Sequence, residues 1–212
     1  MAVTTPASTG ADSGATRPLE SEKAKRIVDA MRESVARRSS AGSTFDHVAR
    51  EAGVSRGLLH YYFGTKERLL VEVVRRDSEI RLGALAAALG DARTADDFLD
   101  ALVRSLEQLI EDDPGFVVLM HELFTLSRRN EEIAGELASL SRAARTDIAA
   151  SLKAKQDEGV VRLGDEPDAV AAVLLALADG LALRFLIEPD LDPRPVIAAA
   201  ETAARALIAD PA

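Results

Sequence analysis

The chain alternates long stretches in which apolar side chains recur every three or four residues with short polar breaks, a spacing typical of amphipathic helices. A first stripe runs from Ser21 to Arg38 and ends at the polar sequence SSAGS, which predicts a helix and its end. Further stripes predict helices over about 44–52, 55–62, 66–89, 94–111, 115–128, 131–157, 167–187 and 194–208. Neither an internal repeat nor the two-residue alternation typical of strands occurs. The sequence therefore predicts an all-α protein of about nine helices, in which three short helices precede a long one.

The second and third predicted helices are joined by a tight turn. Thr44 and Ser55 are good N-cap residues, and Gly53 supplies the left-handed conformation that ends the second helix. Ala49 is small enough to let the two helices cross closely. This is the helix-turn-helix arrangement, with the first helix covering its apolar face. Any tight corner between helices needs a glycine and a small residue, so the spacing alone is also compatible with a corner that binds no DNA.

Four ring-bearing residues stand in a row at 60–63, in a chain that is only 4% aromatic. On a helix that begins at Ser55, the side chains of Leu59, Tyr62 and Phe63 share one face and are expected to pack on neighbouring helices. The other face carries Arg56, Gly57, His60 and Tyr61. Helix-turn-helix docking would lay that second face in the major groove of DNA.

Each residue of the outward face has its own expected role. Arg56 can bridge a guanine or bind a phosphate, and His60 can offer a ring donor or acceptor to a base. Tyr61 is expected to contact the DNA backbone through its hydroxyl group. Gly57 costs about 1 kcal/mol relative to alanine inside a helix, so a close approach to DNA explains it better than helix propensity does. Leu58 contacts a thymine methyl group or nothing, and Arg56 and His60 have the alternative of being solvent-exposed without a partner.

Charge is unevenly distributed along the chain. From Arg17 to Lys66 there are ten Lys and Arg against six Asp and Glu, although the whole chain of 212 residues has a net charge of −9. A basic N-terminal segment on an acidic protein is expected when one part of the molecule meets a polyanion. A merely solvated surface explains such a division about as often.

Several functional classes find little support. The chain has no cysteine and three histidines, which leaves few ligands for a metal site, and we expect neither metal nor cofactor. The adjacent residues His121 and Glu122 point about 100° apart on a helix, so they are poorly placed to act as an acid–base pair. No nucleophile motif, glycine-rich phosphate loop or zinc-ligand spacing occurs. The sequence therefore does not predict an enzyme.

The chain is expected to be soluble and cytoplasmic. Residues 1–18 are small and polar and lack the basic start and apolar run of a secretory signal, which favours a disordered tail. An apolar run at 168–187 is interrupted by Asp179, Gly180 and Arg184, so we do not expect it to span a membrane.

The sequence TFDHVAREAGVSRGLLHYYFGTKERLL closely resembles the DNA-binding domain of the TetR family of transcriptional regulators. The resemblance covers about residues 20–75 and includes the AGVS turn, a glycine two residues after its serine, the aromatic cluster and a Lys-Glu-x-Leu motif. It implies that Lys66 binds a DNA phosphate. Two positions depart from the family pattern: His60 replaces the usual tyrosine, and Gly64–Thr65 replaces a pair that is commonly charged or polar. Neither departure undermines the fold, but His60 puts any borrowed operator sequence in doubt.

The resemblance also implies a second, variable helical domain that dimerises and often binds a small ligand. The predicted organisation is a tail at 1–18, a helix-turn-helix domain at 19–65 and a regulatory and dimerisation domain at 66–212. The predicted function is a repressor that binds a pseudo-palindromic operator in double-stranded DNA as a homodimer and is released by a small, largely apolar effector. An activator, and a helical interaction protein without sequence-specific DNA binding, are the alternatives.

Two further sets of residues are candidates in the second domain. The helix at 167–187 is apolar almost all round, which favours a symmetric partner over a deeply buried core helix. The expected dimer interface consists of Val173, Leu174, Leu177, Leu181, Ile197, Ala200, Ala204 and Leu207. The expected effector pocket consists of Phe98, Leu102, Phe116, Met120, His121, Phe124, Arg145 and Leu152, with Glu122 as a further polar group. Ordinary core packing explains the apolar members of this pocket equally well.

Overall fold

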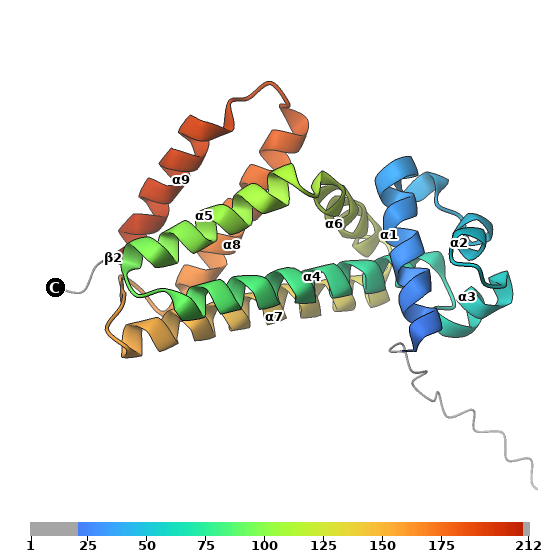
Figure 1. The fold of residues 1–212 in the computed structure, drawn as a ribbon, viewed down its shortest axis with the longest axis horizontal. Helices are drawn as coiled ribbons and strands as arrows, with labels where there is room; N and C mark the ends of the chain where they lie inside the picture. Colours follow the sequence, from blue (N-terminus) through green and yellow to red (C-terminus); the bar gives the residue numbers. More distant parts are fainter. Residues whose placement is uncertain (1–20, 210–212) are drawn as a thin grey trace, which may run out of the picture.

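The computed structural model describes residues 21–209 and confirms the all-α class (Figure 1). The expected tail at 1–18 lies outside the described residues. The helices are α1 (Glu22–Gly42), α2 (Phe45–Glu51), α3 (Arg56–Tyr62), α4 (Lys66–Asp91), α5 (Ala95–Glu111), α6 (Pro114–Ser127), α7 (Glu131–Asp157), α8 (Pro167–Ile187) and α9 (Pro193–Leu207). Most helix boundaries lie within two residues of those expected from the apolar spacing.

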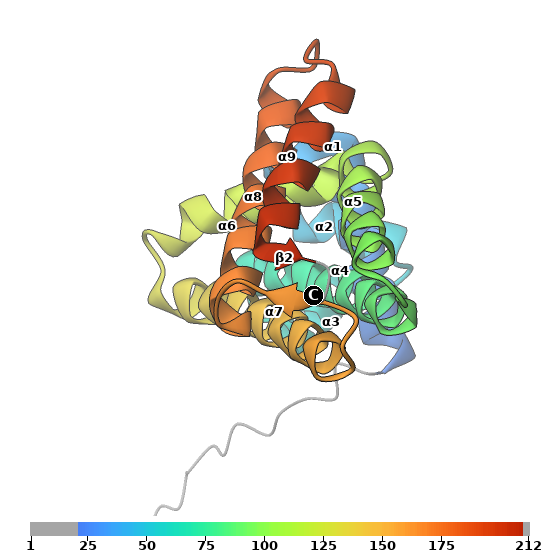
Figure 2. The ribbon, with the colours of Figure 1, turned by 90° about the vertical axis from the view of Figure 1, so that its left-hand side faces the viewer.

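The helices α1, α2 and α3 form a head at one end of the molecule (Figure 1). The long helix α4 leaves this head and runs beside α7 along the length of the molecule. The helices α5, α8 and α9 lie over the far part of this pair (Figure 1). The helices α8 and α9 are joined by the loop at the top of both views and contact each other (Figures 1 and 2). The helix α6 lies between the head and the far part and contacts α1, α4, α5, α7 and α8.

Two apolar clusters form the core. The cluster nearer the head joins residues of α1, α2 and α3 to the first half of α4 and to Leu119, Leu123 and Ile133 of α6 and α7. The distal cluster contains Phe98 and Leu152, both completely buried, and joins α5, α7, α8 and α9. The cluster nearer the head crosses the domain boundary predicted at residue 65. Because its side chains are closely packed, a movement of α4 or α6 also displaces residues of the head.

The helix α1 is longer than expected. The SSAG segment after Arg38 was predicted as a break, but the helix continues to Gly42. Its last turn is stabilised from outside, because the ammonium group of Lys66 donates to the carbonyl oxygen of Ser40. The buried Ser34 hydroxyl donates to Ser43 at 2.9 Å just beyond the helix end. Tertiary partners thus satisfy polar groups that made this segment look like a loop.

A short strand pair closes the C-terminal part of the described chain, although no strand was expected. The strands β1 (Arg162–Leu163) and β2 (Ile208–Ala209) are antiparallel, with Leu163 paired to Ile208. The side chain of Ile208 is completely buried in the distal cluster. Two residues are too few for any alternation to be detected in sequence, so only the packing of α9 reveals this pair.

A buried lysine ties the far ends of α4 and α7 together. The ammonium group of Lys155 donates hydrogen bonds to the carbonyl oxygen of Gly90 at 2.6 Å and to the carboxylate of Glu158 at 2.8 Å. The carbonyl groups in the last turn of a helix lack partners within the helix, so this bond satisfies one of them.

The helix α8 is long and apolar enough, by length and composition, to cross a membrane, with a mean hydropathy of 2.2. Length and composition alone do not distinguish a membrane span from a core helix of a soluble protein, so the expectation that this helix does not span a membrane stands. In the fold α8 packs on α5, α6, α7 and α9, yet only 22% of its most apolar 18-residue window is buried. An apolar face therefore remains uncovered in the single chain.

Candidate nucleic-acid interface and effector groove

The helix-turn-helix is built by the residues that its pattern indicated. The Thr44 side chain accepts a hydrogen bond from the His47 amide and caps α2, and Gly53 adopts φ +65° at the turn. The amide of Val54 donates to the carbonyl oxygen of Ala49 at 3.0 Å, which pulls the turn tight against α2. The position of Ser55 as N-cap of α3 is confirmed, but its side chain makes no capping hydrogen bond within the described chain.

The aromatic cluster divides between core and surface. Leu59 and Phe63 are buried in the head, and Tyr62 is half-buried, with its hydroxyl accepting a hydrogen bond from Ser21 at 3.0 Å. This confirms the expected inward face of α3. Tyr61 is 52% exposed and meets the Tyr62 ring edge-on. Leu58 is half-buried against the head's apolar cluster, so much of its side chain is already occupied by the protein's own core.

The outward face of α3 carries two oriented polar side chains. The guanidinium of Arg56 donates to both carboxylate oxygens of Asp46 on α2, at 3.0 and 3.2 Å. The Nδ1 atom of His60 lies 3.1 Å from the carbonyl oxygen of Gly64, and the ring meets Phe45 edge-on. Because a carbonyl can only accept, Nδ1 carries the proton of this bond, which leaves Nε2 as the ring atom for an outside partner.

No side chain or backbone atom among residues 21–209 requires a glycine at position 57 for steric reasons. A Cβ atom built there would meet only the Ser55 hydroxyl, at 3.9 Å, so alanine would fit the free protein. The loss of helix propensity at this position is therefore not explained by packing inside the head.

Lys66 lies where the first turn of α4 meets the head, but its ammonium group is bonded to the Ser40 carbonyl and is half-buried. The sequence anticipated an outward-pointing phosphate ligand. An ammonium group has three donors, so two remain for a second partner.

The residues expected to form an effector pocket do not surround one cavity. Phe98 and Leu152 are completely buried and Leu102 packs against them, as the alternative of core packing predicted. Phe116 and Met120 instead pack on the cluster nearer the head. The remaining members scatter: Phe124 is 59% exposed, and Arg145 forms an ion pair with Asp168 at 2.9 Å.

His121, the last member of that set, lines an open groove of about 450 Å³ between α6, α8 and the end of α1. The groove is lined by Ser40, Val118, His121, Glu122, Thr125, Leu126, Leu183 and Leu186. Five of these residues lie on one stripe of α6 at helical spacing, a signal that sequence analysis could have found. The contributions of α1 and α8 come from distant parts of the chain and had no such signal.

The lining of the groove includes one acidic side chain, Glu122. One carboxylate oxygen of Glu122, Oε2, is buried and has no hydrogen-bond partner among residues 21–209. On α8, Asp179 reaches solvent, yet the surrounding protein desolvates its carboxyl group and raises its pKa, an effect that His121 opposes. A buried carboxylate without a partner is costly unless a cation or donor satisfies it.

The helices α8 and α9 carry the expected dimer residues, but with a rotated register. Leu174 and Ala204 are each only 8% exposed and belong to the distal core, so they are corrected from interface to core. Val173 is 46% exposed, and Leu177, Leu181, Ile197, Ala200 and Leu207 are half-buried. The outermost stripe of α8 instead consists of Ala169, Ala172, Val173, Ala176 and Gly180.

Comparison with known proteins decides the family. The bacterial regulatory proteins of the tetR family match residues 27–73, which contain the helix-turn-helix, and the family of BetI-type transcriptional repressors, C-terminal, matches residues 95–209. The chain belongs to the TetR family. Because the C-terminal match is of BetI type, this TetR-family member is a DNA-binding transcriptional repressor and not an enzyme.

Individual relatives agree with this assignment. Over 171 residues the chain is 34% identical to the HTH-type transcriptional regulator BetI of Agrobacterium fabrum, covering 78% of each protein. A TetR-family regulator from Rhodococcus sp. superimposes with a TM-score of 0.72 at 25% identity, covering 88% of this chain and 98% of that one. A regulator from Saccharomonospora viridis solved in complex with choline gives a TM-score of 0.62 at 27% identity, covering 77% and 84%.

Proposed function

We propose that this TetR-family repressor binds a pseudo-palindromic operator as a homodimer, through the outward face of α3 and its flanks, and that a small effector releases it. The observation that carries the DNA contact is the exposed Arg56 beside a glycine that the chain itself does not require. Close approach of a DNA backbone explains that glycine. The proposed contacts are Thr44, Ser55, Arg56, Gly57, Leu58, His60, Tyr61 and Lys66.

The uncovered face of α8 supports the homodimer. Its outer stripe, from Ala169 to Gly180, is apolar and made mostly of small side chains, which lets a second copy approach closely. Two heads placed about 34–36 Å apart would meet successive major grooves, and half-site spacing would follow the symmetry of the protein. Such a dimer acts on chromosomal DNA, which places it in the cytoplasm.

The groove beside α6 supports a refined effector class. Its apolar lining fits the small, largely apolar molecule expected from sequence, while the unsatisfied Glu122 oxygen and the neighbouring Asp179 favour a positive charge. The related regulator from Saccharomonospora viridis holds choline, a small organic cation. We therefore propose a cationic molecule with apolar surface as the effector.

The DNA-binding proposal is tested by fluorescence anisotropy with promoter fragments that flank the gene, at several salt concentrations. A sequence-selective complex with a strong salt dependence is expected. Binding of equal strength to unrelated DNA would favour the interaction protein without sequence-specific DNA binding.

The effector proposal is tested by titrating choline chloride into the protein–operator complex. Operator affinity is expected to fall. Glu122→Gln is expected to weaken choline binding by at least tenfold, because loss of a contact to a charged group costs about 1.5–3 kcal/mol and about 1.4 kcal/mol is a factor of ten. Glu166→Gln, at an exposed glutamate before α8 whose side chain makes no capping hydrogen bond within residues 21–209, serves as the matched control. An unchanged choline affinity in the Glu122 variant would remove this groove as the cation site.

A further inference from the structure

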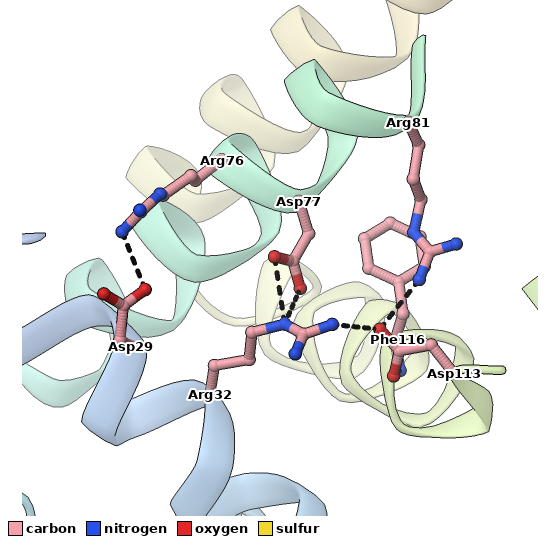
Figure 3. Close-up of polar contacts among 7 residues, drawn as sticks. All are labelled: Asp29, Arg32, Arg76, Asp77, Arg81, Asp113 and Phe116. Carbon is pink, nitrogen blue, oxygen red and sulfur yellow. Dashed lines mark hydrogen bonds and ion pairs between the residues drawn. The ribbon is translucent and has the colours of Figure 1, made fainter. Parts of the chain in front are cut away.

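The carboxylate of Asp113 is shared by three structural elements (Figure 3). Its Oδ1 accepts the Phe116 amide at 3.2 Å and caps the N-terminus of α6. Its Oδ2 accepts from Arg32 of α1 at 2.5 Å and from Arg81 of α4 at 2.7 Å. One side chain thus holds the first turn of α6 against both the DNA-binding head and the connecting helix.

The two arginines are themselves anchored. The Nε atom of Arg32 donates to both carboxylate oxygens of Asp77 on α4, at 3.1 and 2.8 Å. The guanidinium of Arg81 lies over the Phe116 ring, 5.0 Å from its centroid (Figure 3). These second contacts restrict each guanidinium to one orientation. A displacement of Asp113 therefore moves the helices that carry Arg32 and Arg81, since the two side chains cannot reorient freely.

Backbone packing reinforces this junction. A Cβ atom on Gly115, in the first turn of α6, would lie 3.4 Å from Asp113 Oδ1 and 3.9 Å from Ala36 of α1. These are ordinary van der Waals distances, so the first turn of α6 lies directly beside α1 at this position. A cavity of about 20 Å³, room for about one water molecule, is lined by Arg32, Asp77, Asp113 and Phe116.

The same helix forms the main wall of the effector groove. The side chains of Val118, His121, Glu122, Thr125 and Leu126 face the groove, and Asp113 caps the start of that helix. A molecule that displaces α6 at the groove must move its N-cap relative to Arg32, because a helix of 14 residues moves largely as a rigid unit. Hydrogen bonds weaken steeply as their distance and angle depart from the optimum. A shift of the α6 N-cap by about 1 Å is therefore enough to break its hydrogen bond with Arg32.

We infer that Asp113 couples the effector groove to the DNA-binding head, with Arg32 and Arg81 as positioning residues that transmit the placement of α6 to α1 and α4. This inference rests on the proposed function. The contact of Asp113 with Arg32 is a direct route from α6 to α1, in addition to the route through Arg81 and α4. A ligand changes operator affinity only through its preference for one of two conformations, and this junction supplies the contact that distinguishes them.

The variant Asp113→Asn isolates the coupling, because asparagine still caps α6 but carries no charge for the two arginines. Arg32→Gln removes the partner in the head. The matched control is Asp192→Asn, which alters another aspartate N-cap, at the start of α9, far from the head. For each protein, operator affinity is measured with and without choline chloride, and choline affinity is measured without DNA.

In the wild type and in Asp192→Asn, choline is expected to weaken operator binding by a factor within the 5–150-fold range of allosteric coupling. In Asp113→Asn and Arg32→Gln this factor falls below about twofold, while choline affinity without DNA is retained. In the double variant the factor is reduced no further than in either single variant, because both changes remove the same contact. An undiminished factor in the Asp113 and Arg32 variants overturns the inference and leaves the proposed function standing.

If choline does not change operator binding by the wild type, the effector assignment is refuted but the role of Asp113 is still open to test. A distance measurement in the absence of effector then tests that role. The chain has no cysteine, so Arg50→Cys on α2 and Lys153→Cys on α7 provide two unique labelling sites. Head-to-body distances are measured in labelled protein mixed with excess unlabelled chain. A broader distance distribution in Asp113→Asn than in Asp192→Asn supports the inference, and identical distributions overturn it.

Discussion

At the scale of single residues, the outward face of α3 pairs its arginine with a carboxylate that orients it. Asp46 binds one terminal nitrogen of Arg56, which leaves the other two guanidinium nitrogens for a guanine edge. Both side chains are about 60% exposed, 59% and 62%, so the pair itself adds little to folding stability. Its consequence lies in orientation: the arginine is presented to DNA in a restricted set of conformations.

Replacing Arg56 by alanine is expected to cost about 1–3 kcal/mol of operator binding and to relax the preference at one base pair. Competition anisotropy with single-base operator variants measures both effects. Arg194→Ala, at a fully solvated arginine on α9, is the control and should leave binding unchanged. An Arg56 variant that retains wild-type affinity and selectivity would show that this arginine is only a surface charge.

Lys66 shows why a residue type does not predict its partner. The resemblance to the TetR family implied a phosphate ligand, and in the folded chain the ammonium group also closes the last turn of α1. The partner is a backbone carbonyl 26 residues earlier, and no side-chain pattern marks such an acceptor. A free carbonyl at a helix end attracts a nearby cation regardless of what else that cation binds.

At the scale of elements, the start of α5 is stabilised by a capping box. Thr94 accepts from the Asp97 amide at 3.1 Å, and the Asp97 carboxylate accepts from the amides of Arg93 and Thr94 at 3.0 Å each. The hydrogen bond from the Arg93 backbone, followed by that from Thr94, lowers the pKa of the Asp97 carboxyl group. The charged form is therefore the one that stabilises the helix.

The sign of the pH dependence follows from this lowered pKa. Because the folded pKa lies below the unfolded one, the contribution is complete above the unfolded value of about 4 and is lost as the pH falls through the folded pKa. Asp97→Ala should lower the thermal unfolding midpoint at neutral pH, and the difference from wild type should shrink in acid. Asp100→Ala, one turn further along α5, is the control. A difference in unfolding midpoint between Asp97→Ala and wild type that stays constant with pH would contradict the capping role of the charged Asp97.

The sequence of helix α8 predicts that one face is uncovered but not which face it is. Its apolar composition predicted an uncovered face, and the structure retains one, but the angular position of that face depends on how α5, α7 and α9 pack against it. The sequence placed Leu174 in the interface, whereas it lies in the core, and the outer stripe passes through Ala176. An element that is apolar all round carries no internal signal of which side faces its own chain.

At the scale of the whole molecule, dimerisation and operator binding should fail together. Ala176→Glu places a charge on the outer stripe of α8 without entering the core of the chain, so the monomer should remain folded. Sedimentation velocity is expected to show a monomer, and operator affinity should fall by at least tenfold, since a single head offers few contacts. Ala138→Glu, at an exposed alanine of α7, is the control. A monomeric variant that still bound the operator tightly would refute this coupling.

The sequence by itself determined the helices, the helix-turn-helix and the family. These features depend on neighbours close in the chain: the apolar period within each helix, the Thr44 cap, the left-handed Gly53 and the inward placement of Leu59 and Phe63. Local geometry settles such features because the side chains concerned are separated by one helical turn or less.

Only the tertiary structure decided which distant side chains meet. Asp113 and Arg32 are 81 positions apart, and the groove combines α1, α6 and α8. The expected pocket failed to assemble because α5 and α7 turn Phe98 and Leu152 into a closed core, while α6 turns His121 toward α8. The physical reason is that packing angles and helix rotations are set by many contacts at once, and no single segment of sequence contains them.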